Sequence, residues 1–218
     1  DIPNYLIMHS DTSKNKNAPI KEVILIDSKV NYNRFVKKTR IDWNISEAIV
    51  RLDKKNVGIN CSFFSNYLVV GKIDYLNYKN CSLNAELEIL KDTLLIAKSN
   101  IVIQDVLSSV RGFIIGENKL DLLIAGEAQK LKSIINHMPK QFKKPFSAFV
   151  CDGLLNYTAV IKGVMNKNYN PYFNMDFDIV NGDFNLKRIP FFLKNMSAKG
   201  HVNNGGNANF QTTVINVS

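Results

Sequence analysis

The side chains that could carry out chemistry are few and widely spaced along this chain. His9, His137 and His201 belong to no HExxH motif and to no histidine-rich cluster. His137 falls at the end of an expected helix, where a cationic group stabilises the negative end of the helix dipole. His201 falls on an expected strand beside a turn, where we expect it to face solvent. We therefore predict no histidine-based metal site and no histidine acid–base pair.

Other catalytic signatures are also missing from the sequence. It contains no GxSxG elbow, no phosphate-binding loop and no GxGxxG after a strand. Asp176 and Asp178 place two carboxylates on one face of an expected strand, but a calcium site needs more oxygen ligands than this stretch offers. We interpret this pair as part of a solvated face. The chain is expected not to be an enzyme and to need no cofactor.

The three cysteines give no metal or redox motif. Cys61, Cys81 and Cys151 are far apart in the sequence, without a CxxC pair, so we predict no zinc site. An odd number excludes complete pairing within the chain. Cys61 and Cys81 could be bridged if their strands are neighbours, but we favour three buried thiols.

The net charge of +9 raises the question of an anionic partner. The basic residues are 23 Lys and only 5 Arg, and nucleic-acid recognition depends on the forked guanidinium of Arg, so we expect no nucleic-acid partner. We interpret the charge as lysine and asparagine on solvated strand faces, with weak attraction to anionic lipid headgroups as the alternative. The basic turn with Lys140, Lys143 and Lys144 is either a headgroup contact or a solvated turn.

Apolar residues alternate with polar ones along most of the chain, which predicts β-strands with one apolar face. Strands are expected near residues 20–27, 29–35, 39–43, 48–52, 58–64, 67–78, 83–90, 93–98, 101–104, 110–115, 120–125, 154–162, 172–180, 183–186, 197–202 and 207–217. Short turns are expected between them, including 53–56, Ser65-Asn66, Ser99-Asn100 and Asn181-Gly182. One amphipathic helix is expected from Glu127 to Met138, with its apolar side chains on one stripe.

This pattern predicts a mainly β fold: an elongated, curled antiparallel sheet that forms a groove, with one short helix near 127–138. An apolar face without a second layer must curl around itself or around an apolar ligand, and the sequence leaves both alternatives open. If the sheet stays open, we expect these residues to line a lipid path: Leu87, Ile89, Phe113, Tyr157, Ile161, Phe173, Phe177, Phe184 and Phe210.

The chain is long enough for a substantial core, and no clear linker divides it. We expect residues 1–218 to form one continuous groove segment, with N-terminal strands in 1–81 and a more regularly alternating region in 82–218. No run approaches the ~20 apolar residues that span a bilayer. The sequence begins Asp1-Ile2-Pro3 and stops at Ser218 after an alternating stretch, so we expect it to be a segment of a longer protein.

A set of strand and turn motifs gives the chain a resemblance to a known family. The motifs are Leu120-Asp-Leu-Leu-Ile-Ala-Gly126, Leu131-Lys-Ser-Ile-Ile135 with Pro139 after it, Asp152-Gly153 through Gly163, Asn170-Pro171, Phe177-Asp-Ile-Val-Asn-Gly-Asp-Phe184, Ile189-Pro190, Asn195-Met196 and Gly200-His-Val-Asn-Asn-Gly205. Val30-Asn-Tyr32 and Trp43-Asn-Ile45 are weaker matches upstream. These residues resemble the AsmA-like proteins of Gram-negative envelopes, relatives of TamB, in the form found in Bacteroidetes.

The resemblance implies a β-groove that conducts or binds lipid in the periplasm and supports outer-membrane homeostasis. It implies phospholipid or another acyl chain as the ligand, and an inner-membrane anchor in a segment outside this sequence. A groove of a dozen strands would be roughly 60 Å long. The alternative function is a structural scaffold module whose apolar face packs against partner chains in an envelope or secretion assembly.

Overall fold

The computed structural model describes residues 5–9, 20–35, 38–116, 118–165, 170–187, 192–205 and 214–218. Nearly all of these residues lie in β-strands, and the helical segments occupy one connection. The elements are β1 Tyr5–His9, β2 Glu22–Arg34, β3 Thr39–Asp53, β4 Asn56–Val70, β5 Ile73–Asp74, β6 Lys79–Leu90, β7 Thr93–Ile103, β8 Val106–Ile115, β9 Lys119–Lys130, α1 Leu131–His137, α2 Lys140–Lys143, the 3₁₀ helix η1 Lys144–Ala148, β10 Phe149–Val164, β11 Tyr172–Leu186, β12 Phe192–Asn203 and β13 Val214–Val217.

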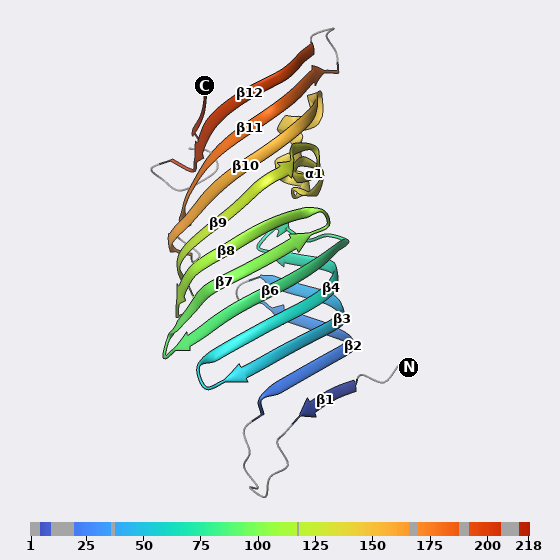
Figure 1. The fold of residues 1–218 in the computed structure, drawn as a ribbon, viewed down its shortest axis with the longest axis vertical. Helices are drawn as coiled ribbons and strands as arrows, with labels where there is room; N and C mark the ends of the chain where they lie inside the picture. Colours follow the sequence, from blue (N-terminus) through green and yellow to red (C-terminus); the bar gives the residue numbers. More distant parts are fainter. Residues whose placement is uncertain are drawn as a thin grey trace, which may run out of the picture.

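The described strands form one antiparallel sheet in which neighbours in sequence are neighbours in space (Figure 1). The order is β1-β2-β3-β4-β6-β7-β8-β9-β10-β11-β12-β13, and the two-residue strand β5 pairs with the end of β4. β1 and β13 lie at opposite ends of this order, so the sheet is open and does not close into a barrel. The predicted fold class is therefore confirmed. Within the described residues, none of the helices has the length and apolar character needed to cross a bilayer.

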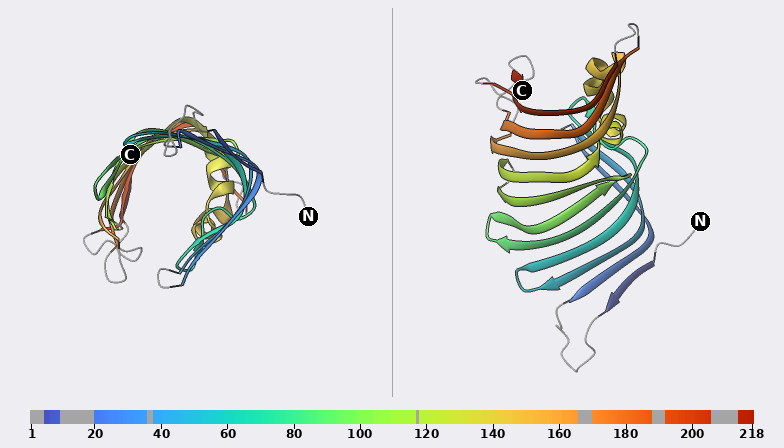
Figure 2. Two further views of the ribbon diagram at one scale, coloured as in Figure 1. Left: turned by 90° about the horizontal axis from the view of Figure 1, so that it is seen from below. Right: turned by 45° about the horizontal axis from the view of Figure 1, so that its top comes forward.

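The strands bend along their length, so the sheet has the cross-section of a C and forms a trough (Figure 2). The axis of the trough runs across the strands. Eleven steps between the twelve strands of the main path give it a length of about 50 Å at about 4.8 Å a step. Rows of paired residues therefore run along the trough, from β1 toward β13.

The bend has a local cause in extra residues near the middle of several strands. Between β6 and β7, Glu86 pairs with Lys98 and Leu87 with Ile96, which leaves Ala97 as an additional residue on β7. Similar shifts interrupt the β3–β4, β7–β8, β9–β10 and β10–β11 ladders. A bulge bends its strand and increases the local twist, so repeated bulges curve the whole sheet in one direction.

Two aromatic rings lie flat on the inner side of the curve because glycine leaves room for them. Tyr157 pairs with Gly126 and with Phe177, and Phe177 pairs with Gly200. A Cβ atom at Gly126 would lie 2.5 Å from the Tyr157 ring, and one at Gly200 would meet the Phe177 ring even more closely. The Tyr157 hydroxyl reaches across Gly126 to Ser108, with 2.6 Å between the two oxygens. These rings therefore form part of the floor and do not fill the trough.

Helix α1 is shorter than the sequence predicts. Residues 127–130 continue β9, and the helix begins at Leu131, since Ala128 adopts a left-handed backbone (φ 50°) that is incompatible with a helix start. The helix ends at His137, and the next residue, Met138, has an extended backbone because Pro139 follows.

Three predicted turns are also wrong. Ser65-Asn66, Ser99-Asn100 and Asn181-Gly182 all lie inside continuous strands. At Asn181 the positive φ of 52° belongs to a bulge, where Asp152 pairs with Asp183 and Leu154 with Val180. Asn-Gly supplies the left-handed conformation that a bulge needs as readily as the one that a hairpin turn needs.

Adding a methyl group beneath the Tyr157 ring tests the packing on the floor. Gly126→Ala is expected to lower the free energy of unfolding by about 1–3 kcal/mol, because the new Cβ displaces the ring and its contact with Ser108. Gly58→Ala is the control, since its Cβ would lie 3.8 Å from the Arg51 Cβ and the change stays within about 1 kcal/mol. Urea unfolding measures both, and equal effects would contradict the packing described.

Candidate functional site: the concave face of the trough

The strand register identifies the side chains that point into the trough. Residues that pair directly across an antiparallel ladder project from the same face. Helix α1 packs on this face against Leu155 and Ile179, and Figure 2 shows the helix on the inner side of the curve, so this is the concave face. One unbroken row of partners crosses it from β2 to β12, here called the central row: Val23, Val50, Ile59, Ala85, Ser99, Val110, Ile124, Ala159, Met175 and Val202.

The alternating positions on the convex face carry the charges. Arg51 and Glu22 pair across β2 and β3 with 2.9 Å between Nε and Oε2. Lys162 and Asp121 pair across β9 and β10 at 2.8 Å. These cross-strand ion pairs are exposed, so they contribute little stability, but they show which side of the sheet faces water.

Most of the residues that the sequence predicts to line a groove do lie on the concave face. The register places there Leu87, Ile89, Tyr157, Ile161, Phe173, Phe177 and Phe184. The prediction for Phe113 is wrong, because this residue lies on the convex face opposite Leu95 and Asp121. The concave positions on either side of Phe113 belong to Gly112 and Ile114. Phe210 lies outside the described residues.

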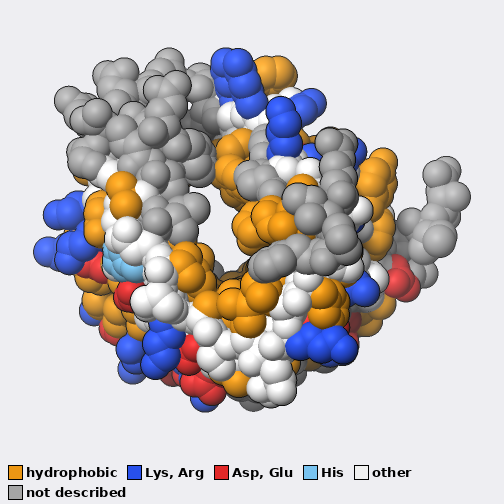
Figure 3. All heavy atoms as spheres, turned by 90° about the horizontal axis from the view of Figure 1, so that it is seen from above, with side chains coloured by type: hydrophobic (Ala, Val, Ile, Leu, Met, Phe, Trp, Pro, Cys, Tyr) orange, Lys and Arg blue, Asp and Glu red, His pale blue; other side chains and the backbone are white. Residues whose placement is uncertain are grey.

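Viewed along its axis, the trough is hollow and hydrophobic side chains line the hollow (Figure 3). Large apolar residues on the floor, such as Leu122, Ile124 and Met175, are only partly buried. The fully buried members of the central row are the small residues Ala85, Ala159 and Ser99. The described residues therefore leave much of this apolar face without a covering layer.

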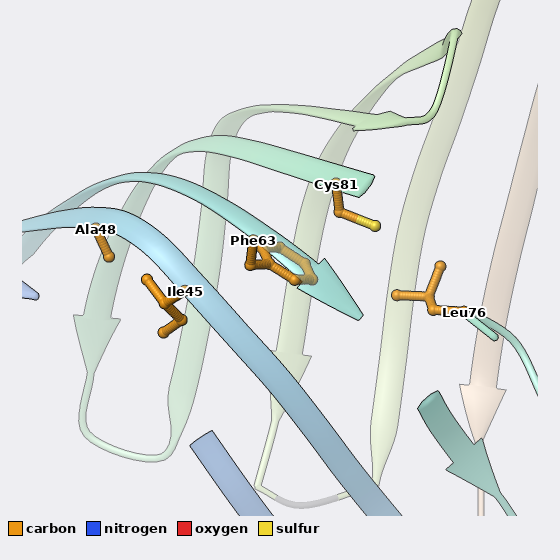
Figure 4. Packing of buried hydrophobic residues seen from close by; sticks show 5 residues of the cluster. All are labelled: Ile45, Ala48, Phe63, Leu76 and Cys81. Atoms are coloured by element: carbon orange, nitrogen blue, oxygen red, sulfur yellow. The ribbon is translucent and has the colours of Figure 1, made fainter. Parts of the chain in front are cut away.

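Two connections on the same rim cover part of the concave face. The first is the segment between β4 and β6, which carries β5 and Leu76. Leu76 is buried against Phe63 and Cys81 of the floor (Figure 4). Trp43 packs beside them, with its ring centroid 4.5 Å from that of Phe63.

The second connection runs from β9 to β10 and contains α1, α2 and η1. Leu131 is its buried contact with the floor and packs with Cys151, Leu155 and Ile179. Ile134 and Ile135 extend this contact, while Lys132 and Asn136 are exposed. The amphipathic stripe predicted from the sequence thus faces the trough.

Polar contacts hold the second connection to the rim. The Ser133 hydroxyl donates to Asp105 Oδ2 at 2.5 Å, and His137 Nε2 lies 3.1 Å from Asp105 Oδ1. The ammonium of Lys79, on β6, donates to the carbonyl oxygen of His137 at 2.6 Å. The hydrogen bond from Ser133 lowers the pKa of the Asp105 carboxyl below its usual 3.8, and the contact with His137 lowers the pKa further.

The three lysines of the basic turn are placed differently. Lys143 is half-buried and its ammonium donates to the carbonyl oxygen of Asn136, near the end of α1. Lys140 and Lys144 are exposed on α2 and at the start of η1. The structure therefore brings Lys143 to the rim of the trough and leaves the other two facing solvent.

The cysteines are free thiols. Cys81 and Cys151 are buried and Cys61 is partly buried, and Cys61 pairs with Leu83 rather than with Cys81. Burial raises the pKa of Cys81 to about 11 and raises those of Cys61 and Cys151 in the same direction. Across the described part of the chain, no group of three or more His, Cys, Asp or Glu side chains is arranged to hold a metal ion.

A polar hollow of about 600 Å³ lies on the rim beside α1, away from the central row. Its lining includes the carboxylates of Asp105, Asp152 and Asp183. Asp152 accepts from the backbone of Gly153, and Asp183 accepts from the backbone of Asn195, so both carboxylates hold local turns and bulges.

Sequence reasoning missed several residues of the concave face, and Lys79 is the charged residue among them. The signal was present, because Lys79 shares its parity with Cys81, Leu83, Ala85 and Leu87 on the same strand. The predicted strand began at residue 83, so Lys79 fell outside the alternating stretch.

No protein-family model, no curated protein and no solved structure matches this chain.

Removing the charge of Asp105 tests how the second connection is held. The folded pKa of this carboxyl is below 3.8, so its contribution is present above that value and is lost as the pH falls through the folded pKa. Asp105→Asn should speed hydrogen exchange of residues 131–138 at neutral pH, and the difference from the parent should shrink below pH 3.8. Asp53→Asn, at the exposed end of β3, is the control. A difference that persists unchanged at acid pH would refute a role for the charge.

Proposed function

We propose that this chain is a lipid-binding, lipid-conducting β-groove in which acyl chains lie along the concave face. The observation that carries the proposal is the central row, an almost wholly apolar track that crosses the sheet from β2 to β12 and is only partly covered. The row runs along the axis of an open trough, which is the shape that a linear hydrocarbon chain occupies.

The length and the chemistry of the track both suit transfer along it. At about 50 Å the trough exceeds the ~30 Å hydrocarbon thickness of a bilayer, so a bound acyl chain has several positions along it. Each methylene group that leaves water for this face gains about 0.8 kcal/mol. Since successive strands offer similar apolar side chains, moving one strand further along exchanges equivalent contacts. Binding of this kind holds an acyl chain without fixing its position along the trough.

The resemblance to AsmA-like envelope proteins supports the same reading. On that basis we place the chain in the periplasm of a Gram-negative envelope, in phospholipid transport or outer-membrane homeostasis. Its inner-membrane anchor would lie in a part of the protein beyond this sequence. Its partners would be a phospholipid or another acyl-chain ligand and other envelope proteins.

The alternative is a scaffold in which partner chains cover the concave face. A covering protein needs polar contacts at defined places as well as apolar area, because interfaces have polar rims and about one hydrogen bond per 100–200 Å². The floor between β3 and β12 offers few such groups along the central row, where Ser99 is the one polar side chain. This favours a hydrocarbon ligand over a protein.

A charge placed on the floor should abolish lipid binding, whereas the same charge on the other face should not. Leu122 and Leu123 are neighbours on β9 and both are partly buried, but Leu122 pairs with Gly112 and Ile161 on the concave face. We expect native mass spectrometry to show co-purifying phospholipid with the parent chain and with Leu123→Glu. Leu122→Glu should lose at least tenfold in occupancy, since a carboxylate in contact with hydrocarbon is strongly disfavoured.

The outcomes separate the two functions. Circular dichroism and urea unfolding establish that both variants remain folded. A folded parent chain that carries no lipid, and takes none up from vesicles of phosphatidylethanolamine and phosphatidylglycerol, would contradict lipid conduction. The scaffold function would then take its place.

A further inference from the structure

Lys79 is the one charged residue at the concave positions of the described strands from β3 to β12. It pairs with Ser65 of β4 and lies on the same face as Cys81 and Leu83. The residue is only 7% exposed, so it does not reach the water outside the trough. Lysine is almost never buried to this extent without a partner for its charge. Its presence on an apolar face therefore requires a reason.

Two further hydrogen-bonding groups stand in the same row. Trp43 pairs with Ser65, and Ser65 pairs with Lys79, so three neighbouring strands place an indole, a hydroxyl and an ammonium side by side along the wall of the trough. Trp43 Nε1 and Ser65 Oγ are buried and have no hydrogen-bond partner. Ser65 is fully buried at 0% exposure. Unpaired buried donors are uncommon, and three adjacent donor groups favour an acceptor with several oxygens.

A second ammonium lies close by. Burial lowers the pKa of Lys79, and repulsion from the like charge of Lys143, on α2, lowers that pKa further. Neither lysine forms an ion pair with a carboxylate of the described residues, and each donates to a backbone carbonyl at the end of α1. The carboxylate of Asp74 raises the pKa of Lys79, and its Oδ1 accepts from the backbone of Leu68. The positive charge at this wall is therefore largely uncompensated.

We propose that the row formed by Trp43, Ser65 and Lys79, together with Lys143, binds the anionic end of an acyl ligand, a carboxylate or a phosphate. This inference rests on the proposed function, because the hydrocarbon tail of that ligand lies along the central row. The ammonium groups of Lys79 and Lys143 contact the anion. Trp43 Nε1 and Ser65 Oγ are both buried, so these two groups reach the anion only when the packing around them opens.

Holding helix α1 in place does not account for this arrangement. The carbonyl of His137 accepts one hydrogen from an ammonium that has three. The end of a helix of seven residues offers at most a partial negative charge, and two ammonium groups share it. A neutral donor would fasten the helix equally well, without the cost of burying a charge.

The test compares ligands that share one saturated chain and differ only at the end: a fatty acid, the alkyl phosphate and the alcohol. The parent chain should bind the two anions at least tenfold more tightly than the alcohol, since a hydrogen bond to a charged group is worth about one to two factors of ten. Lys79→Met should remove most of that preference and leave binding of the alcohol unchanged. Lys143→Met should do the same to a smaller extent, and Lys144→Met, on the exposed side, should have no effect.

Each outcome bears on a separate claim. Equal affinity of the parent chain for the acid, the phosphate and the alcohol would overturn the anion site and leave lipid binding intact. Failure of all three to bind would overturn the proposed function itself. A preference for the fatty acid or for the alkyl phosphate tells which anion the site binds. Displacement of the bound fatty acid or alkyl phosphate by inorganic phosphate alone would show a site for free anions instead. If Lys79→Met fails to fold, Lys143→Met carries the test.

The orientation of the bound fatty acid provides a second readout, which a purely structural role for Lys79 would not produce. Trp43 is the one tryptophan of the sequence and belongs to the row that forms the proposed site. A fatty acid brominated next to its carboxylate should quench Trp43 fluorescence more strongly than one brominated near its methyl end. Lys79→Met should abolish the difference between the two. Equal quenching in the parent chain would contradict a fixed headgroup.

Discussion

The structure depends on one constraint: a long single sheet has an apolar face, and the described residues form no second sheet to cover it. Apolar surface left in water is unfavourable at about 25 cal/mol per Å², so the face must be bent inward or covered. Repeated bulges bend the strands into a C, and two connections on one rim cover part of that face. A partly exposed apolar floor remains along the trough, and the proposed function follows from this exposed floor.

The floor stays open because its largest rings lie flat. Tyr157 and Phe177 are bulky enough to fill a narrow trough, yet glycine partners at Gly126 and Gly200 let both rings rest on the sheet. The missing side chains of these two glycines therefore leave space in the trough for a ligand. The same sheet puts its cross-strand ion pairs on the convex face, which separates the wet side from the apolar side.

Much of this arrangement could be predicted from alternation alone, and the misses have physical reasons. Tyr157 and Phe177 stand in strictly alternating stretches, so their face was predictable. Phe113 stands beside Gly112 and Ile114, where apolar residues occur at both parities and only the pairing with Leu95 decides the face. Asn181-Gly182 predicts a turn but forms a bulge, since both use a positive φ. The meeting of Lys79 with Lys143 depends on contacts between segments distant in sequence, which no local pattern encodes.

Photo-crosslinking with a phospholipid that carries a diazirine within its acyl chain tests the central claim most directly, because it records which side chains the hydrocarbon touches. Peptide mapping should find adducts at concave positions such as Ile59, Val110, Leu122 and Met175 across several strands. Adducts at the convex neighbours Leu95 and Leu123 should be rare. Equal labelling of the two faces, or labelling confined to the convex face, would contradict a lipid path along the trough.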